Sequence, residues 1–211
     1  MREIRRVPIG QFVDGLREIP EESFSRERIL QQMTGLLLDR ASLVPYRHFI
    51  PEHYTRNMVF RNDLFELLVI CWGVGQVTPV HNHDNQLGWM TVQEGMLSLQ
   101  NYRRVSCAMG GPGDDPDRCK AGSTKPVILE EVAQIDIASV GAVTTTDRQE
   151  TIHQIGNLAA FGEPALSVHV YSRPIDSCVI YDLDRKTCQR VPLVYHSEQG
   201  RVVTPAQSFD S

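Results

Sequence analysis

The chain has 211 residues, 22% of them charged, and a formal net charge of −5. An acidic balance without a long basic run argues against a nucleic-acid partner and against a membrane surface. No stretch is long and apolar enough to cross a bilayer. The charged residues 1–9 are not followed by an apolar run, so we expect no signal peptide.

The length predicts a single domain over residues 1–211, with a helical cover at residues 1–50 and a barrel at residues 54–200. In the helical part, Ser25 is a typical helix-start residue. Apolar residues follow it at helical spacing: Ile29, Leu30, Met33, Leu36 and Leu37. We expect this segment to cover one end of a sheet.

From about residue 58 onward, short apolar runs are separated by glycine, proline, asparagine and aspartate. Strands are predicted at residues 64–72, 89–93, 96–103, 126–131, 135–139, 165–172, 178–182 and 190–195. Many short strands at this spacing favour an all-β sandwich or barrel. Inward-facing side chains of a small antiparallel barrel converge on one cavity, which suits a buried metal site.

The cysteines form no C-x-x-C pair and no repeated spacing: Cys71, Cys107, Cys119, Cys178 and Cys188. An odd, unpatterned set is typical of reduced thiols in the cytoplasm, where we place the protein. Cys71 lies in an apolar strand and is expected to be a small buried side chain. A disulfide between Cys107 and Cys119 is the less favoured alternative, and the sequence leaves open whether loop 107–122 closes over a site.

Two histidines, His81 and His83, are separated by one residue after an apolar strand and a glycine-rich turn. Side chains two positions apart on a strand point to the same face, so both imidazoles can reach one metal ion. The pair stands in the pattern Gly75-x5-His81-x-His83-x4-Gly88-x6-Gly95. This pattern is similar in every spacing to the first motif of the cupin proteins. Gly88 replaces the glutamate that serves many cupins as a metal ligand.

His153 is the candidate third ligand, because His153-x3-Asn157 resembles the end of the second cupin motif. The P-x-G that precedes the histidine in that motif is absent here. Three histidines form a neutral ligand set, unlike the two-histidine, one-carboxylate set of many non-haem iron enzymes. A neutral set leaves the full 2+ charge on the metal and favours an anionic donor such as a thiolate. Zinc also accepts three histidines, so the ligands alone do not choose the metal.

Ser167, His169 and Tyr171 alternate with apolar residues in the predicted strand 165–172, so their side chains share one face. One interpretation is a hydrated barrel interior with satisfied polar groups. The other is a relay in which Ser167 and His169 orient the Tyr171 hydroxyl over the metal.

Arg56 stands in the segment Tyr54-Thr-Arg-Asn57, just before the first barrel strand. An arginine is usually a solvated surface charge. A guanidinium that faces a cavity is instead suited to a substrate carboxylate, which it holds through two hydrogen bonds.

Together these segments resemble cysteine dioxygenase, a thiol dioxygenase family with the cupin fold, from about residue 54 to residue 200. The segments that carry the resemblance occur in matching order: Tyr54-Thr-Arg-Asn57, Cys71-Trp-Gly73, His81-x-His83, His153-x3-Asn157, Glu163-Pro-Ala-Leu-Ser-Val-His-Val-Tyr-Ser172 and Asp176-Ser-Cys178. The resemblance implies an all-β, small antiparallel jelly-roll barrel with ferrous iron (Fe2+) bound by His81, His83 and His153. It further places Arg56 on the substrate carboxylate with Tyr54 beside it, and Tyr171 near the carboxylate and the oxygen, supported by His169 and Ser167.

The implied reaction is the oxidation of the thiol of L-cysteine by O2 to cysteine sulfinic acid, without an external reductant. In the mammalian type of this family, a cysteine at the position of Gly88 is cross-linked to the tyrosine that corresponds to Tyr171. Gly88 has no sulfur, so Tyr171 is expected to remain a free phenol, as in many bacterial members. This departure widens the substrate alternatives to other thiol acids, 3-mercaptopropionate or mercaptosuccinate, whereas Arg56 favours cysteine.

The expected partners are a small-molecule thiol and O2, with no nucleic acid, no membrane and no protein partner evident. Two alternatives belong to other classes. A cupin isomerase would work without oxygen and would not need Arg56 and Tyr171 around a three-histidine site. A ligand-binding cupin sensor would not be an enzyme and would hold no redox-active iron.

Overall fold

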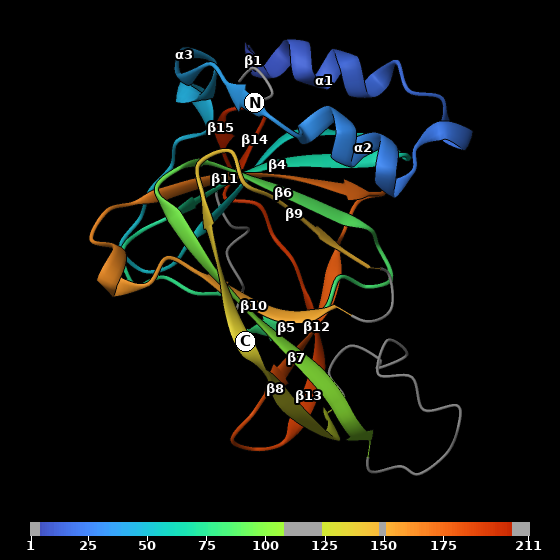
Figure 1. The fold of residues 1–211 in the computed structure, drawn as a ribbon, viewed down its shortest axis with the longest axis vertical. Helices are drawn as coiled ribbons and strands as arrows, with labels where there is room; N and C mark the ends of the chain where they lie inside the picture. The colour runs from blue at the N-terminus through green and yellow to red at the C-terminus, as the bar shows by residue number, and fades with distance from the viewer. Residues whose placement is uncertain (1–4, 108–123, 148–150, 204–211) are drawn as a thin grey trace, which may run out of the picture.

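The computed structural model describes residues 5–107, 124–147 and 151–203. A seven-stranded sheet and a closed six-stranded barrel make up most of it (Figure 1). The sheet runs in the order β15 (Arg201–Val202), β14 (Ser197–Glu198), β3 (Thr55–Arg61), β4 (Phe65–Trp72), β11 (Ala165–Ser172), β6 (Gly88–Glu94) and β9 (Val143–Thr146). The barrel runs in the order β10 (Ile152–Gly156), β5 (Val80–His81), β12 (Ser177–Asp182), β13 (Thr187–Pro192), β8 (Thr124–Ser139) and β7 (Met96–Cys107).

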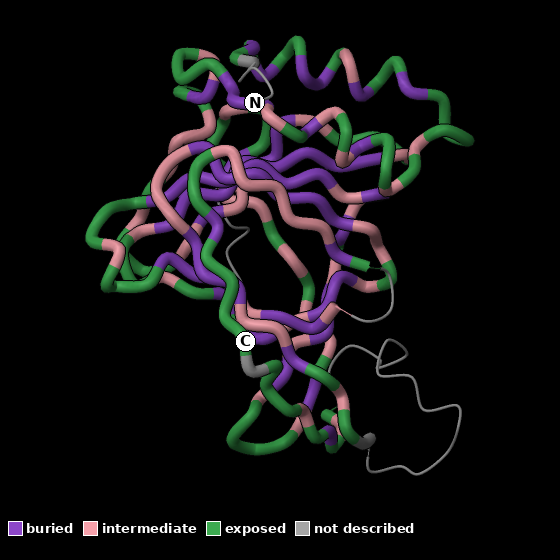
Figure 2. The backbone as a smooth tube through the Cα atoms, viewed as in Figure 1, coloured by how far each residue is buried: buried purple, intermediate pink, exposed green. Residues whose placement is uncertain are grey.

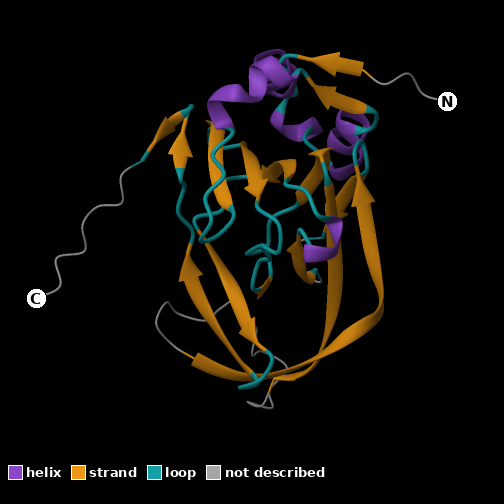
Figure 3. Ribbon diagram, turned by 90° about the vertical axis from the view of Figure 1, so that its left-hand side faces the viewer, coloured by secondary structure: helices purple, strands orange, loops and turns teal. Residues whose placement is uncertain are grey.

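The amino-terminal residues lie over the outer face of the seven-stranded sheet (Figure 3). They form β1 (Arg5–Val7), α1 (Ile9–Arg17), a 3-10 turn (Glu21–Ser23), α2 (Arg26–Met33), β2 (Leu36–Leu38), α3 (Arg40–Leu43) and a second 3-10 turn (Val44–Tyr46). A further 3-10 turn, Ala159–Phe161, lies between β10 and β11.

Ser25 begins α2 as predicted, because its side chain accepts a hydrogen bond from the backbone N–H of Arg28 at 3.2 Å. The predicted continuation of this helix through Leu36 and Leu37 is wrong. Gly35 has a φ of +71°, a left-handed conformation that interrupts the helix, and the chain then enters β2. Strand β2 pairs in parallel with β1, a contact between distant segments that helical periodicity cannot indicate.

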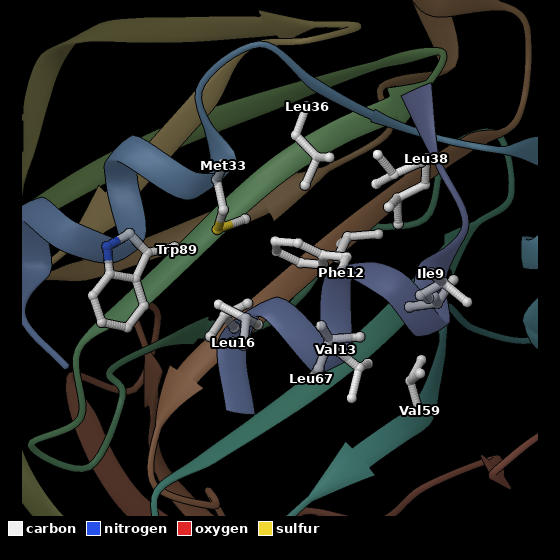
Figure 4. Close-up of a cluster of buried hydrophobic side chains, with 14 of the residues drawn as sticks. Ile9, Phe12, Val13, Leu16, Met33, Leu36, Leu38, Val59, Leu67 and Trp89 are labelled. Carbon is white, nitrogen blue, oxygen red and sulfur yellow. The ribbon is translucent and has the colours of Figure 1, made fainter. Parts of the chain in front are cut away.

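The core between the helices and the sheet consists of buried apolar side chains that pack against one another (Figure 4). Strand β4 is buried along its whole length, and alternate residues face opposite sides. Phe65, Leu67, Val69 and Cys71 face the helices, so the expectation of a buried Cys71 is confirmed. Full burial of one such large side chain contributes roughly 1.5–3 kcal/mol, and the many side chains of this cluster together hold the short helices on the sheet.

A second core joins the inner face of the sheet to the barrel. Leu68, Ile70 and Trp72 of β4 pack there against Leu99 of β7 and Ile155 of β10. Figure 2 shows the buried strands gathered in the upper part of the molecule, with exposed backbone around the far end of β7, β8 and β13. The functional side chains lie between the sheet and the barrel, beside this second core.

Several predicted strands have different bounds in the structure. Predicted strands 126–131 and 135–139 are one strand, β8, because register shifts opposite β7 allow the pairing to continue past an irregular polar stretch. Predicted strand 190–195 is displaced, since β13 ends at Pro192. Strand β5 has two residues, so His83 follows the strand rather than lying on it. The single domain and its division at about residue 50 remain a prediction.

No helix among the described residues is long and apolar enough to cross a membrane. The possible pair Cys107–Cys119 and the loop at 107–122 depend on residues outside the described ranges.

Candidate metal centre and substrate cavity

The three predicted histidine ligands come together at the barrel wall that faces the sheet. His81 of β5 is directly opposite His153 of β10 in the antiparallel register, and His83 follows two residues later. One ring nitrogen from each histidine lies within 4.8 Å of the other two. The ring centroids are 4.7–5.2 Å apart. Among the described residues, these three histidines are the cluster of candidate ligands that could hold a metal ion.

The chemistry of these histidines fits a metal ion. Burial lowers the pKa of His81, and it lowers the pKa values of His83 and His153 well below the usual histidine value. All three rings are therefore neutral near pH 7, the state in which imidazole binds metals. The Nδ1 atom of His81 lies 2.9 Å from the carbonyl oxygen of Pro79, which assigns the proton to Nδ1 and leaves Nε2 for a metal. Nε2 of His153 is buried without a hydrogen-bond partner among the described residues.

Ser167, His169 and Tyr171 of β11 form one hydrogen-bonded row beside the histidines. Ser167 Oγ lies 2.8 Å from His169 Nε2, and His169 Nδ1 lies 3.2 Å from the Tyr171 hydroxyl. The row is anchored at its far end, where Trp72 Nε1 donates to Ser167 Oγ at 2.9 Å. The Tyr171 ring stacks on His83 with centroids 6.0 Å apart, so the row ends next to the metal centre.

Two further properties define the chemical state of this row. Burial lowers the pKa of His169 to about 3, so its ring is neutral at physiological pH. Burial also raises the pKa of Tyr171, so its phenol keeps its proton. These properties make His169 a neutral orienting group and Tyr171 a hydrogen-bond donor.

Arg56 of β3 is nearly buried, with 10% of its side chain exposed, and it lines the same cavity. Its Nη2 lies 3.4 Å from Oε1 of Glu66, whose side chain is fully buried. Its Nη1 is buried and has no hydrogen-bond partner among the described residues. A desolvated N–H donor without an acceptor is costly, so this nitrogen is suited to an anionic ligand.

Tyr54 lines the same cavity as Arg56 and stacks on Trp72 with ring centroids 4.9 Å apart at 25°. Burial raises the pKa of Tyr54, so its phenol is also neutral. Because Trp72 also binds Ser167, one indole ring connects the arginine side of the cavity with the tyrosine row.

The cavity enclosed by these groups has a volume of about 180 Å³. Pockets for drug-sized ligands are larger, roughly 300–1,000 Å³, so this cavity suits a small molecule. The polar side chains at its walls come from histidines, tyrosines, an arginine, a threonine and an asparagine: Tyr54, Arg56, Thr78, His81, Asn82, His83, His169 and Tyr171. Much of the remaining lining is aliphatic: Ile70, Ile155, Ile175, Ile180, Val191 and Leu193.

Gly88 lies where a larger residue would press on the tyrosine. A Cβ atom built on it would lie 2.5 Å from Thr146 Oγ1 and 3.2 Å from Cε1 of Tyr171. Strand β6 pairs with β11 so that Gly88 is directly opposite Tyr171. The absence of a side chain at position 88 therefore leaves the Tyr171 ring uncrowded, and position 88 provides no metal ligand.

Two asparagines from the motifs identified in the sequence, Asn57 and Asn157, make hydrogen bonds that stabilise the fold. Asn57 Nδ2 binds the Val69 carbonyl oxygen at 3.2 Å, and its Oδ1 accepts from Ser197 Oγ at 2.8 Å. Asn157 Nδ2 binds the Glu163 carbonyl oxygen at 2.8 Å, which ties the loop after β10 to the start of β11. These bonds hold the strands that carry Arg56 and the histidines.

Sequence reasoning missed two residues of the site. Glu66 is the charged residue of an otherwise apolar, fully buried strand, and that contrast is a usable signal for a paired buried charge. Cys178 lines the cavity, and burial raises its thiol pKa to about 11. Its position at the cavity depends on the pairing of β12 with β5, which no local pattern indicates.

A neutral three-histidine centre in a small antiparallel barrel defines a metal-binding cupin, which confirms the predicted fold class. The profile of the family "Cysteine dioxygenase type I" matches residues 22–184. The chain therefore belongs to the cysteine dioxygenase type I family, and it is an enzyme of the thiol dioxygenase class.

Known relatives agree with this assignment. The chain is 27% identical to cysteine dioxygenase type 1 of Homo sapiens over 175 residues, which cover 82% of this chain and 78% of the human protein. It is 25% identical to the Bos taurus protein of the same name, over 87% of this chain and 82% of that protein.

Among solved structures, a Thermus thermophilus protein has a TM-score of 0.43 at 16% identity, over 63% of this chain and 95% of that one. A Klebsiella pneumoniae protein with a double-stranded β-helix domain has a TM-score of 0.38 at 18% identity, over 67% of this chain and 95% of that one.

Proposed function

We propose that this enzyme oxidises the thiol of L-cysteine with O2 to cysteine sulfinic acid, with ferrous iron held by His81, His83 and His153. The observation that carries the proposal is one cavity that is lined both by His81 and His83 of the neutral three-histidine cluster and by a buried cation, Arg56, with a free donor nitrogen. A small molecule with a thiol for the metal and a carboxylate for the arginine matches both ends. The family of the chain and the names of its relatives support the same substrate.

When bound, iron would supply the dioxygen chemistry and would lower the pKa of a coordinating thiol. The protein residues position the substrate and control protons. Nη1 of Arg56 would bind the substrate carboxylate and thereby fix the distance between carboxylate and sulfur. Tyr54, stacked on Trp72, would close the wall beside that carboxylate.

The tyrosine row would hold one proton at the Tyr171 oxygen. This role needs the His169 tautomer in which Ser167 Oγ donates to Nε2 and Nδ1–H donates to the Tyr171 oxygen. The Tyr171 O–H is then left to donate into the cavity, toward a negatively charged carboxylate or oxygen atom. The apolar lining would exclude bulk water, so that O2 oxidises the bound sulfur rather than taking part in side reactions with water.

Other thiol acids are the second candidate. 3-Mercaptopropionate has the same thiol and carboxylate, and it lacks only the amine. Mercaptosuccinate has two carboxylates, whereas the described cavity offers one cation, so we expect it to be the poorer substrate. A reduced cytoplasm, in which ferrous iron and free thiols persist, is the proposed location.

A side-by-side oxygen-uptake assay with iron-loaded protein tests the proposal. We expect the largest kcat/KM with L-cysteine, a smaller value with 3-mercaptopropionate, and the smallest of the three with mercaptosuccinate. A larger kcat/KM for 3-mercaptopropionate than for cysteine would make 3-mercaptopropionate the assigned substrate. No oxygen uptake with any small thiol would overturn the proposed reaction.

A further inference from the structure

Glu66 is a carboxylate in a place where carboxylates are rarely found. It lies in β4 between Phe65 and Leu67, and its side chain has no exposed surface. By alternation it faces the inner side of the sheet, together with Leu68 and Ile70. Burial of an ionised carboxylate is expensive unless it is paired and hydrogen-bonded, so its partners indicate what it does.

Each carboxylate oxygen of Glu66 has a defined partner. Oε1 lies 3.4 Å from Nη2 of Arg56, and Oε2 accepts from the backbone N–H of Ile175 at 3.0 Å. The hydroxyl of Tyr195 donates to the same carboxylate. These groups come from β3, from the segment after β11 and from the segment after β13, so Glu66 connects three segments of the chain, and two of the groups, Arg56 and Ile175, line the cavity.

The contacts continue outward to a second arginine. Arg61 forms two hydrogen bonds with the carboxylate of Asp176, at 2.7 and 2.9 Å, and a third with the Tyr195 hydroxyl at 2.8 Å. The Tyr195 ring faces the guanidinium of Arg56, with Cζ 5.4 Å from the ring centroid. A chain of contacts thus runs from Asp176 at the surface through Arg61, the Tyr195 hydroxyl and Glu66 to Arg56.

A bulge in β3 makes this chain of contacts possible. Arg56 and Arg61 are five residues apart, so in a regular strand they would face opposite sides. The register shifts between Met58 and Phe60, and Arg61 becomes the direct partner of Glu66. Both arginines therefore lie on the same face as Glu66. Of the two, Arg56 is the one that lines the cavity.

We propose that Glu66 is a positioning residue that holds Arg56 through Nη2, so that Nη1 remains free and correctly placed to select thiols that carry a carboxylate. The inference rests on the proposed function, because it assigns the determinant of carboxylate selectivity to that same site. Glu66 does not itself line the cavity; it contacts two residues that do, Arg56 and Ile175, so it acts on a bound carboxylate through Arg56.

The test compares L-cysteine with cysteamine, which lacks the carboxylate, in iron-loaded wild type, Glu66→Ala and Glu66→Gln. The measured quantity is the ratio of the two kcat/KM values. We expect Glu66→Ala to lower this ratio about tenfold, mainly through the KM for cysteine. We expect Glu66→Gln to lower it less, because one amide oxygen can still accept from Arg56.

Two comparisons separate positioning from a merely structural role. In the Arg56→Ala background, Glu66→Ala should change the ratio less than about twofold, because the group it positions is absent. Glu94→Ala removes a partly buried carboxylate that is paired with Arg47 at 2.7 Å and lies outside the cavity lining, and it should leave the ratio unchanged. An equal fall for both thiols in Glu66→Ala, or a further fall in the double variant, would overturn the proposal.

Anaerobic calorimetry keeps this test independent of turnover. We expect the Kd of iron-loaded protein for 3-mercaptopropionate to rise about tenfold in Glu66→Ala, while the Kd for cysteamine stays constant. If no thiol is oxidised by the wild type but this difference in Kd is found, the proposed reaction fails and the positioning role stands. Equal Kd values in wild type and Glu66→Ala would refute the positioning role.

Discussion

Replacing Arg56 with alanine should impair both substrate binding and stability, for two separate structural reasons. The substrate carboxylate loses a charge-assisted hydrogen bond from Nη1, which contributes roughly 1.5–3 kcal/mol. Because each 1.4 kcal/mol corresponds to a factor of ten, the KM for L-cysteine should rise about 10- to 100-fold. The KM for cysteamine should stay within about threefold of the wild-type value, because cysteamine has no carboxylate.

The stability effect follows from Glu66, which is fully buried and would lose its cationic partner. Leaving one member of a buried pair uncompensated costs about 3–5 kcal/mol. For a chain of this length, that loss lowers Tm by about 10 °C. Arg47→Ala is the matched control, because it removes the 2.7 Å partner of Glu94, whose side chain is 19% exposed. A more exposed pair contributes about 0–1 kcal/mol, so Tm should change little.

The stability deficit of Arg56→Ala should also depend on pH. Burial raises the pKa of Glu66, and the Arg56 charge opposes that rise. Removal of the arginine therefore raises the pKa further. A carboxyl with a raised folded-state pKa is favoured at low pH and is penalised as pH rises through that value. Urea unfolding should show a smaller deficit at pH 5 than at pH 8. Wild-type stability at pH 8 together with an unchanged KM for cysteine would refute this reasoning.

Three further predictions concern the histidines and Gly88. His153→Ala should lose most of its bound iron by elemental analysis, and full retention would contradict the ligand assignment. Gly88→Ala should be destabilised by about 1–3 kcal/mol, since its Cβ would lie 2.5 Å from Thr146 Oγ1. The control Gly10→Ala, with open space in α1, should be about 0.5–1 kcal/mol more stable, and equal Tm shifts would exclude the clash. Because the folded-state pKa of His169 is about 3, metal-free protein should lose stability as pH falls from about 6.5 toward 3. His169→Gln should reduce that loss by about 2 kcal/mol between pH 7 and 4.5. Plots of unfolding free energy against pH that run parallel for wild type and His169→Gln would refute this prediction.

Local sequence patterns predicted those parts of the molecule that depend on near neighbours. Strand alternation placed Ser167, His169 and Tyr171 on one face, and the structure shows them in one hydrogen-bonded row. The short His-x-His spacing likewise brought His81 and His83 together. These arrangements need only the period of a strand or a turn, so a single segment is sufficient to indicate them.

The features that were missed, or that only a motif resemblance indicated, depend on pairings between distant segments. The pairing of β5 with β10 sets His153 opposite His81, and the sequence indicated His153 only through a motif resemblance. Glu66 acquires its role from Arg56 across β3 and β4 and from Ile175 far along the chain. The end of the helix before Leu36 was not predicted, because the regular apolar spacing continues past Gly35 into strand β2.

Isotope labelling of the product tests the central claim most directly. Iron-loaded protein should be incubated with L-cysteine under ¹⁸O2, and the product analysed by mass spectrometry. The account predicts cysteine sulfinic acid that carries two ¹⁸O atoms, because both atoms of O2 are transferred to sulfur. A product with one or no ¹⁸O, or disulfide as the sole product, would contradict the assignment of this cavity to thiol dioxygenation.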